Sequence, residues 1–223
     1  MARHYESPVL KTENLAPGVR LLSLQRPAEL TWLPGQGVVV EAGSPALLCR
    51  YSIATAPELP AHFEIVADLS SGGACARYIG ALEPGDIVRY QAPIGEFSFD
   101  RAPGAPLALI GYEVGIAALR PIVQRLFQHR LLFPVRLHHF VKDTSLQLFR
   151  KEFVSEVFRR ENFEYEVLFD IPMKDYLYGR YVAGTAERKW HFYVCGPNPD
   201  VQHVAELLRG AGYDPAGVHV EQW

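Results

Sequence analysis

The chain has 223 residues, of which 48% are hydrophobic and 21% charged, and its formal net charge is −3. This length suits one large domain or two small ones, with ample apolar content for their cores. The charge balance gives no basic surplus for nucleic acid or anionic lipid, and the longest apolar runs, such as 107–110, are too short to span a bilayer.

The N-terminus and the cysteines bear on location and redox state. Residues 1–5 lead straight into polar sequence, without the apolar segment of a secretion signal. Cys49, Cys75 and Cys195 are too few and too widely spaced for a disulfide framework or a C-x-x-C metal site. They also exclude an iron–sulfur cluster held within the chain, which normally needs about four thiolates. We therefore expect a reduced, cytoplasmic protein.

The first hundred residues read as strands rich in β-branched and aromatic residues, separated by turns that contain Pro and Gly. The expected strands are 19–25, 37–41, 47–55, 62–68 and 87–91. Strands at this spacing predict a small antiparallel barrel, with a short helix over 76–81.

The period of the pattern changes after a linker over 100–106 that is rich in Pro and Gly. Beyond it, strands and helices alternate, which predicts a parallel doubly wound sheet. The expected strands are 107–110, 135–140, 164–169 and 191–194, and the expected helices are 115–128, 146–160 and 200–209. In the helix over 146–160, one apolar face is expected from Phe149, Phe153, Val154, Val157 and Phe158. We expect two domains, 1–102 and 103–223.

Short motifs follow one another in a recognisable order. They are Tyr51-Ser52 in a strand, Gly72-Gly73 before the short helix, residues 93–97 (PIGEF), and Cys195-Gly196-Pro197 near the end. In this order, over residues 8–223, the chain resembles the ferredoxin–NADP reductase family. It is most similar in character to the electron-transfer subunit of dihydroorotate dehydrogenase and the hydrogenase gamma subunit, without their cluster segment. The resemblance implies a flavin-binding barrel followed by a nicotinamide-binding domain.

The resemblance gives the strand around Tyr51 a role in flavin binding. Tyr51 would pack by the flavin ring and Ser52 would bond its N5 edge, with Ile53 beside them. The family's arginine, which pairs with the pyrophosphate, stands two places before the tyrosine, where this chain has Cys49. Arg50 comes one place late, so strand alternation turns it to the opposite face unless a bulge re-aims it. The alternative is a barrel strand without a ligand.

The second flavin element of the family reads Gly-Gly-x-x-Ser. Here Gly72 and Gly73 match, but Ala76 takes the place of the serine. The helix N-terminus still favours an anion by roughly 0.3–1 kcal/mol, and Arg77 would add a charge-assisted contact. The alternative is a simple glycine turn.

The nicotinamide half departs further from the family form Gly-x-Gly-x-x-Pro. Gly115 matches and would receive the pyrophosphate, but Glu113 replaces the first glycine and Ala118 the proline. Two like charges about 4 Å apart repel by about 4 kcal/mol at an effective dielectric constant near 20. Either the Glu113 carboxylate turns to solvent, or NAD(P)H binds poorly or elsewhere.

The remaining candidates lie toward the C-terminus. Cys195 and Glu221 would line the site of hydride transfer, with Gly196 and Pro197 binding the cofactor. Lys142 matches a position near the cofactor's adenosine end, and Trp223 would stack on the flavin. The alternatives are a buried small residue, a solvated lysine and a tryptophan that fills a core.

A metal site is not expected, because the adjacent His138 and His139 face opposite ways on a strand. The resemblance implies an FAD-dependent oxidoreductase, with FAD favoured over FMN by the resemblance alone. NAD(P)H would deliver hydride to flavin N5, and electrons would leave to a separate protein, a free flavin or a small oxidant. The rival hypothesis is a degenerate, non-catalytic binding subunit with an impaired nicotinamide site.

Overall fold

The computed structural model describes residues 2–43, 47–58, 61–128, 132–184 and 187–223. The chain divides into two compact units. Unit 1 comprises residues 1–100 and 120–128, and unit 2 comprises residues 101–119 and 129–223. The expected boundary between residues 102 and 103 stays a prediction.

Unit 1 is an antiparallel sheet of six strands in the order β4-β3-β6-β1-β2-β5. Its elements are β1 (Arg3–Ala16), β2 (Val19–Gln25), β3 (Gly37–Ala42), β4 (Leu47–Ser52), β5 (His62–Asp68), α1 (Ala74–Ala81) and β6 (Ile87–Ile94). An isolated antiparallel bridge between Ile53 and Ile65 joins the two ends of the strand order. The sheet therefore curls on itself, as expected for the predicted barrel, around a core that includes Leu22, Val38 and Phe63.

Strand β1 is absent from the sequence-based prediction. It is long and largely exposed, and its charged residues hide the alternation that marks a half-buried strand. It pairs with β2 through one half and with β6 through the other. Helix α1 begins at Ala74 rather than at residue 76.

Unit 2 is a parallel sheet of five strands in the order β11-β10-β7-β8-β9, as the alternation of strands and helices predicts. Its strands are β7 (Leu107–Tyr112), β8 (Val135–Val141), β9 (Phe163–Phe169), β10 (His191–Gly196) and β11 (Val218–Gln222). Its helical segments are η1 (Glu113–Gly115), α2 (Ile116–Leu126), η2 (Thr144–Leu146), α3 (Arg150–Arg159), α4 (Met173–Leu177), η3 (Tyr178–Val182), α5 (Asn198–Gly210) and η4 (Pro215–Gly217). Residues 120–126 of α2 group with unit 1.

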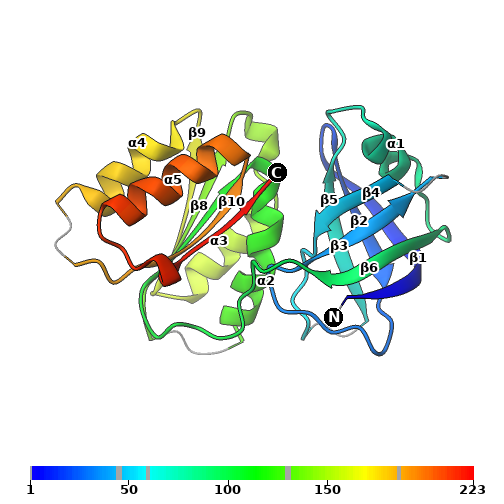
Figure 1. Ribbon diagram of the computed structural model, residues 1–223, viewed down its shortest axis with the longest axis horizontal. Coiled ribbons are helices and arrows are strands. Elements are labelled where there is room, and N and C mark those ends of the chain that lie inside the picture. The colour runs from blue at the N-terminus through cyan, green and yellow to red at the C-terminus, as the bar shows by residue number, and fades with distance from the viewer. Residues whose placement is uncertain (1, 44–46, 59–60, 129–131, 185–186) are drawn as a thin grey trace. The chain divides into compact units, whose positions relative to one another are not determined.

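The helices of unit 2 cover both faces of its sheet, with α4 and α5 on one face and α3 on the other (Figure 1). Strand order reverses between β7 and β10, because β8 and β9 continue on one side of β7 and β10 and β11 on the other. In open α/β sheets, ligands bind beyond the carboxyl ends of the strands at such a reversal.

The prediction for the helix over 146–160 is wrong in two respects. The helix begins at Arg150, because Phe149 has a left-handed backbone with φ of 57°. Phe153 is buried against Tyr165, but Phe158 is 86% exposed. Val157 is also exposed, so the apolar residues do not form one buried face.

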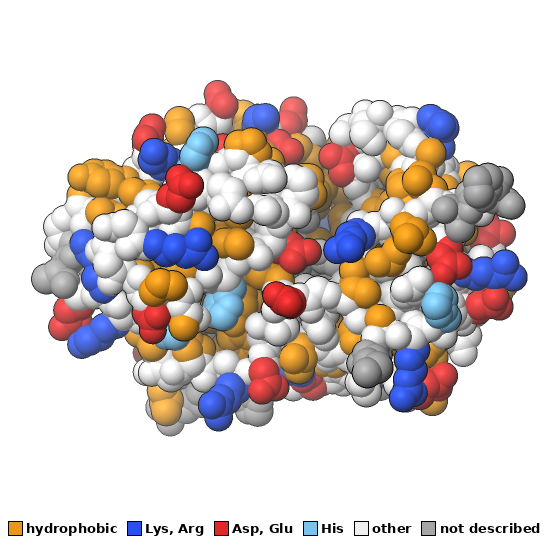
Figure 2. Space-filling view, viewed as in Figure 1, with side chains coloured by type: hydrophobic (Ala, Val, Ile, Leu, Met, Phe, Trp, Pro, Cys, Tyr) orange, Lys and Arg blue, Asp and Glu red, His pale blue; other side chains and the backbone are white. Residues whose placement is uncertain are grey.

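The surface carries both signs of charge. On the face drawn in Figure 2, Lys and Arg side chains are interspersed with Asp and Glu. Within the part of the chain that the structure describes, no helix combines the length and apolar character needed to cross a membrane.

Candidate functional site

The end of strand β4 presents two hydroxyl groups. Tyr51 and Ser52 are half-buried, and neither hydroxyl hydrogen-bonds another described residue. Burial raises the pKa of Tyr51 to about 12, so its phenol stays neutral. Unpartnered, half-buried hydroxyls are groups that a ligand can satisfy.

Strand alternation decides the place of Arg50. The β3–β4 pairing is regular, with Val38 opposite Tyr51 and Val40 opposite Cys49, so no bulge re-aims the strand. Arg50 is therefore exposed on the same face of the strand as Ser52. Cys49 and Tyr51 lie on the opposite face. Ile53 is fully buried and forms the bridge to Ile65.

Helix α1 presents an uncapped N-terminus. Gly73 is its N-cap and supplies no side chain, and Gly72 and Gly73 are both exposed. A Cβ at Gly72 would have no neighbour within 4 Å, so the space beside it is open. Arg77 donates to the carbonyl oxygen of Gly72 over 2.5 Å, which holds a guanidinium at the same turn. Ala76 is buried and offers only its backbone N–H.

A disulfide joins these two segments, which corrects the expectation that the cysteines are reduced. Cys49 of β4 is bonded to Cys75 of α1, with 5.8 Å between their Cα atoms. The two cysteines are 26 positions apart and gave no sequence signal of pairing, because only the curl of the sheet brings the two elements together. Cys195 is free and buried. The bond brings the Tyr51–Ser52 end of β4 close to the glycine turn of α1.

In unit 2, the predicted nicotinamide residues gather where the parallel strands end. Strand β7 leads into Gly115, β8 into Lys142, β10 into Gly196, and β11 into Trp223. Gly115 has no room for a side chain, because a Cβ there would lie 2.5 Å from the carbonyl oxygen of Cys195 and 2.9 Å from the indole of Trp223. Trp223 is 56% exposed and lies against Gly115 within unit 2.

The turn after β7 keeps a glycine-like backbone at Glu113, where φ is 46°. His139 holds this turn: its Nε2–H donates to the carbonyl oxygen of Glu113 over 2.9 Å. Burial lowers the pKa of His139 to about 4, so the ring is neutral. Lys142 lies near the same turn, with its Nζ 5.6 Å from the ring centre of Tyr112, and Tyr112 and Glu113 raise its pKa.

Cys195 and Glu221 occupy paired positions on the neighbouring strands β10 and β11. Burial, with a smaller contribution from the Glu221 charge, raises the pKa of the Cys195 thiol well above its ordinary value. The thiol is therefore neutral. Gly196 packs against Tyr112, where a Cβ would lie 2.9 Å from that of the tyrosine, and Pro197 precedes α5.

His138 and His139 point to opposite faces of the sheet, as strand alternation requires, and they contact different partners. His138 lies 2.6 Å from the hydroxyl of Tyr181 through Nε2 and 3.0 Å from Glu166 through Nδ1. The imidazole lowers the pKa of Glu166 to about 2, and Tyr176 donates to the same carboxylate. This network around the buried His138 and Tyr181, which the sequence pattern did not indicate, ties β8 and β9 to α4 and η3.

Two further glycines matter to the candidate sites, and sequence analysis gave them no role. A Cβ at Gly37 would collide with the backbone of Tyr51, and one at Gly111 would lie 3.0 Å from the backbone of Ile116. Gly37 thus sets the approach of β3 to Tyr51, and Gly111 sets the approach of β7 to the start of α2. Gly111 lies two residues before the quoted Glu113–Gly115 turn, which was the available signal for it.

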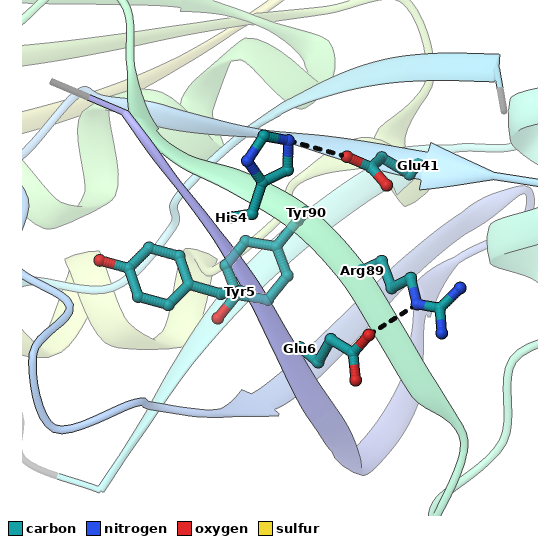
Figure 3. A pocket seen from close by; sticks show the side chains of 6 residues that line it. All are labelled: His4, Tyr5, Glu6, Glu41, Arg89 and Tyr90. Carbon is teal, nitrogen blue, oxygen red and sulfur yellow. Dashed lines mark hydrogen bonds and ion pairs between the residues drawn. The ribbon is translucent and has the colours of Figure 1, made fainter.

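A separate hollow of about 240 Å³ opens on the outside of unit 1 between β1, β3 and β6 (Figure 3). Its charges pair with one another: His4 lies 3.5 Å from Glu41, and Arg89 lies 2.7 Å from Glu6. Tyr5 stacks on Tyr90 at its floor. The residues that line it include none of the predicted site residues.

Comparison with known proteins places these features. Residues 6–99 match the family model of the oxidoreductase FAD-binding domain. The chain is 25% identical to ferredoxin–NADP reductase B of Sorangium cellulosum, with all of this chain and 98% of that protein covered. It is 24% identical to the toluate 1,2-dioxygenase electron transfer component of Pseudomonas putida, covering 98% of this chain and 67% of that one.

Two other likenesses extend the comparison. The chain is 26% identical to a flavohemoprotein of Oceanobacillus iheyensis, of which it spans about half, 51%, using 86% of its own length. A crystal structure of a ferredoxin NADP⁺ reductase from Neisseria gonorrhoeae with bound FAD and NADP superposes with a TM-score of 0.87 at 18% identity. That superposition covers 100% of this chain and 99% of the other, and it shows the fold.

A curled antiparallel sheet that matches an oxidoreductase FAD-binding domain is followed by a parallel sheet, which together make the two-domain fold seen in the ferredoxin NADP⁺ reductase structure. Residues 6–99 match an oxidoreductase FAD-binding domain, and the whole chain is similar to ferredoxin–NADP reductase-like proteins in sequence and fold. Its particular resemblance to the dihydroorotate dehydrogenase and hydrogenase subunits stays a prediction.

The residues present fit the two cofactors unequally. For FAD, unit 1 offers the unpartnered hydroxyls of Tyr51 and Ser52, the open space at Gly72 and the uncapped start of α1. For NAD(P)H, unit 2 keeps the glycine-like turn at Glu113 and the strand ends around Gly115, but it adds a carboxylate at that turn. Cofactor roles for the individual residues remain predictions.

Proposed function

We propose that this protein is an FAD-dependent oxidoreductase that takes electrons from NAD(P)H and passes them to a separate acceptor. The observation that carries the proposal is the placement, in an FAD-binding domain, of the Tyr51–Ser52 strand end beside the uncapped N-terminus of α1. FAD, when bound, supplies a ring that accepts a hydride and releases electrons singly or in pairs.

The proposal gives defined tasks to Tyr51, Ser52, Arg77 and the start of α1 in unit 1. The neutral phenol of Tyr51 packs against the ring, and the Ser52 hydroxyl donates to its edge. The first N–H groups of α1 receive the phosphates, since they lack partners within the helix. Arg77, already bonded to the carbonyl oxygen of Gly72, adds positive charge at this turn. Arg50 is exposed on the face that it shares with Ser52.

The tasks proposed for unit 2 concern the nicotinamide cofactor. Gly115 and the start of α2 receive the pyrophosphate, with Gly196 and Pro197 beside them and Lys142 nearby. Cys195, as a neutral thiol, and Glu221 line the place of hydride transfer. Trp223 covers this place as an aromatic lid. Support comes from the convergence of these residues at the carboxyl ends of the strands.

The acceptor is proposed to be a protein, a free flavin or a small oxidant. Relatives named as a ferredoxin–NADP reductase and a dioxygenase electron transfer component support a protein acceptor. We also propose a cytoplasmic location, where disulfides are rare and are usually transient or redox-sensing. Fractionation of cells that express the tagged protein tests the location.

A visible absorption spectrum tests the proposed function. The purified protein, supplied with FAD, is expected to show the absorption bands of a flavoprotein, which NADH or NADPH bleaches without oxygen. Protein that takes up no FAD would contradict the proposal. Stopped-flow mixing with each nucleotide, followed by addition of ferricyanide or free FMN, measures the two half-reactions separately.

A second candidate function is a flavin-binding subunit without nicotinamide chemistry. The Glu113 carboxylate at the turn after β7 favours it, because this charge repels a pyrophosphate. A yellow protein that neither nucleotide bleaches would support this candidate.

A further inference from the structure

One covalent bond joins the two segments that the proposed function assigns to FAD. Cys49 precedes Tyr51 by two residues on β4, and Cys75 is the second residue of α1, which lies beside β4 (Figure 1). We propose that Cys49 and Cys75 form a reversible oxidation site whose disulfide form holds the start of α1 in place and raises the affinity for FAD. This inference rests on the proposed function.

A departure from the family pattern at Cys49 and a variable position of that pattern at Cys75 become one feature in this proposal. Cys49 stands where the family has its phosphate-binding arginine, and Cys75 falls between the glycines and Ala76. The arginine would draw the strand and the phosphate turn together through the bound cofactor. The disulfide draws the same two segments together through a covalent bond, before any cofactor binds.

The two ends of α1 are held differently. At its C-terminal end, Ile79 is fully buried, and Arg20 donates to the carbonyl oxygens of Gly80 and Leu82 over 2.8 and 2.7 Å. This end therefore stays attached to unit 1 whatever the state of the cysteines.

The N-terminal end of α1 depends on the disulfide. Residues 71–74 are exposed, and their hydrogen bonds to other described residues are local: Gly72 donates to the carbonyl oxygen of Leu69, and Gly73 to the hydroxyl of Ser71. Ala76 adds a small buried methyl group. The bond from Cys75 to Cys49 is thus the strongest tie between this end and the strand that carries Tyr51.

The exchange chemistry enters through Cys75, which is half-buried, whereas Cys49 is 4% exposed. In the oxidising direction, the Cys75 thiolate attacks a low-molecular-weight disulfide such as oxidised glutathione and expels one thiolate. The Cys49 thiolate then attacks the mixed disulfide at the Cys75 sulfur and expels the second. The small disulfide takes up two electrons, and the two protons lost by the cysteines convert its thiolates to thiols.

Reduction is expected to weaken FAD binding without unfolding the sheet. In the reduced protein the turn samples more conformations. FAD binding must then order this turn, and the lost conformational entropy reduces the binding free energy. A cost near 1 kcal/mol corresponds to about a fivefold rise in the dissociation constant.

The experiment compares FAD binding by the full chain in its two redox states. Apoprotein is oxidised with glutathione disulfide or reduced with a phosphine, and mass spectrometry after alkylation confirms two additional modified thiols in the reduced form. FAD is then titrated by flavin fluorescence. We expect the reduced protein to bind about fivefold more weakly and its amides over 71–77 to exchange hydrogen faster.

The matched control is Cys75→Ala, which retains the helix but lacks the bond. Its dissociation constant should equal that of the reduced wild type and should not respond to the phosphine. Equal affinity of the oxidised and reduced wild type would overturn the inference and leave the proposed function standing. Absence of FAD binding in both states would overturn the proposed function, and this inference with it.

Discussion

Glu113 combines a left-handed backbone, which is typical of glycine, with a charged side chain. Its φ of 46° lies in the left-handed region, which costs an ordinary residue about 1–2 kcal/mol and which glycine adopts freely. The turn is nevertheless held, because His139 binds its carbonyl oxygen. The turn therefore has a backbone that glycine favours, and it carries a carboxylate.

Replacement of Glu113 by glycine should strengthen NAD(P)H binding at least about tenfold, since it removes the negative charge that repels the pyrophosphate. Glu113→Gln is the matched variant, because it removes the charge but keeps the side chain and its backbone cost. We expect it to gain only part of the improvement. Titration of NADH and NADPH by fluorescence measures both. Unchanged affinity in both variants would show that the carboxylate does not face the ligand.

The buried His139 should make the stability of unit 2 depend on pH. Its pKa is about 4 in the folded protein, against an ordinary value near 6.5, so the unfolded chain binds the proton more readily. This contribution leaves stability unchanged above pH 6.5. It lowers the free energy of unfolding as pH falls from 6.5 to 4, by up to about 3 kcal/mol.

His139→Gln keeps an N–H donor near Glu113 but has no proton to take up. Urea unfolding of the variant should show a shallower loss of stability between pH 6.5 and 4 than the wild type. His138 and Glu166 titrate in both proteins, so they cancel in the difference. Parallel pH curves for the two proteins would contradict the assignment.

The direction of a side chain was predictable where the alternation of a strand sufficed. The outward face of Arg50 followed from its shift by one residue, whereas the flavin-binding roles of Tyr51 and Ser52, which were taken from a motif, stay predictions. The Cys49–Cys75 bond was not predictable, because no local pattern tells which elements a curled sheet brings together. The placement of Trp223 against Gly115 likewise depends on the pairing of β11 with β10.

At the scale of elements, the disulfide should stabilise unit 1 by restricting its unfolded chain. A loop of 26 residues corresponds to about 3.5 kcal/mol in the chain-entropy model. Reduction should therefore lower the free energy of unfolding of unit 1 by about this amount at neutral pH. Hydrogen exchange of the β3 and β4 amides measures it, with the β7 and β8 amides of unit 2 as the internal reference. A loss confined to unit 2 would be incompatible with this origin.

Elements with a regular period were predictable, and those that depend on distant partners were not. Strands β2 and β5 have the predicted bounds, since each is a run rich in apolar residues that a turn signal bounds. Strands β1 and β11 lack that signal: β1 divides its pairing between two neighbours, and β11 is a half-exposed edge strand. The five-residue helix α4 is too short to show a period.

At the scale of the whole molecule, each unit consists of two separate segments of the chain. It builds the curled sheet, passes into unit 2 at residue 101, and returns to unit 1 through residues 120–128. The returning segment is bonded within unit 1: Arg120 donates to the carbonyl oxygen of Ala54 over 2.9 Å and to Glu64 over 2.5 Å. Gln124 accepts from the backbone N–H of Ala56 over 2.9 Å. A single helix, α2, thus contributes residues to both units.

The ion pair of Arg120 should contribute more to the free energy of unfolding of unit 1 than the exposed ion pairs of that unit do. The Arg120 and Glu64 side chains are 14% and 16% exposed, so Arg120→Ala leaves a poorly solvated carboxylate and is expected to cost about 2–4 kcal/mol. Arg89→Ala is the matched control, because Arg89 and its partner Glu6 are exposed and such pairs contribute about 0–1 kcal/mol. Hydrogen exchange of the β2 and β5 amides in both variants provides the measurement. Equal losses in the two variants would mean that the Arg120 pair is as weak as a surface pair and that the returning segment does not stabilise the curled sheet through it.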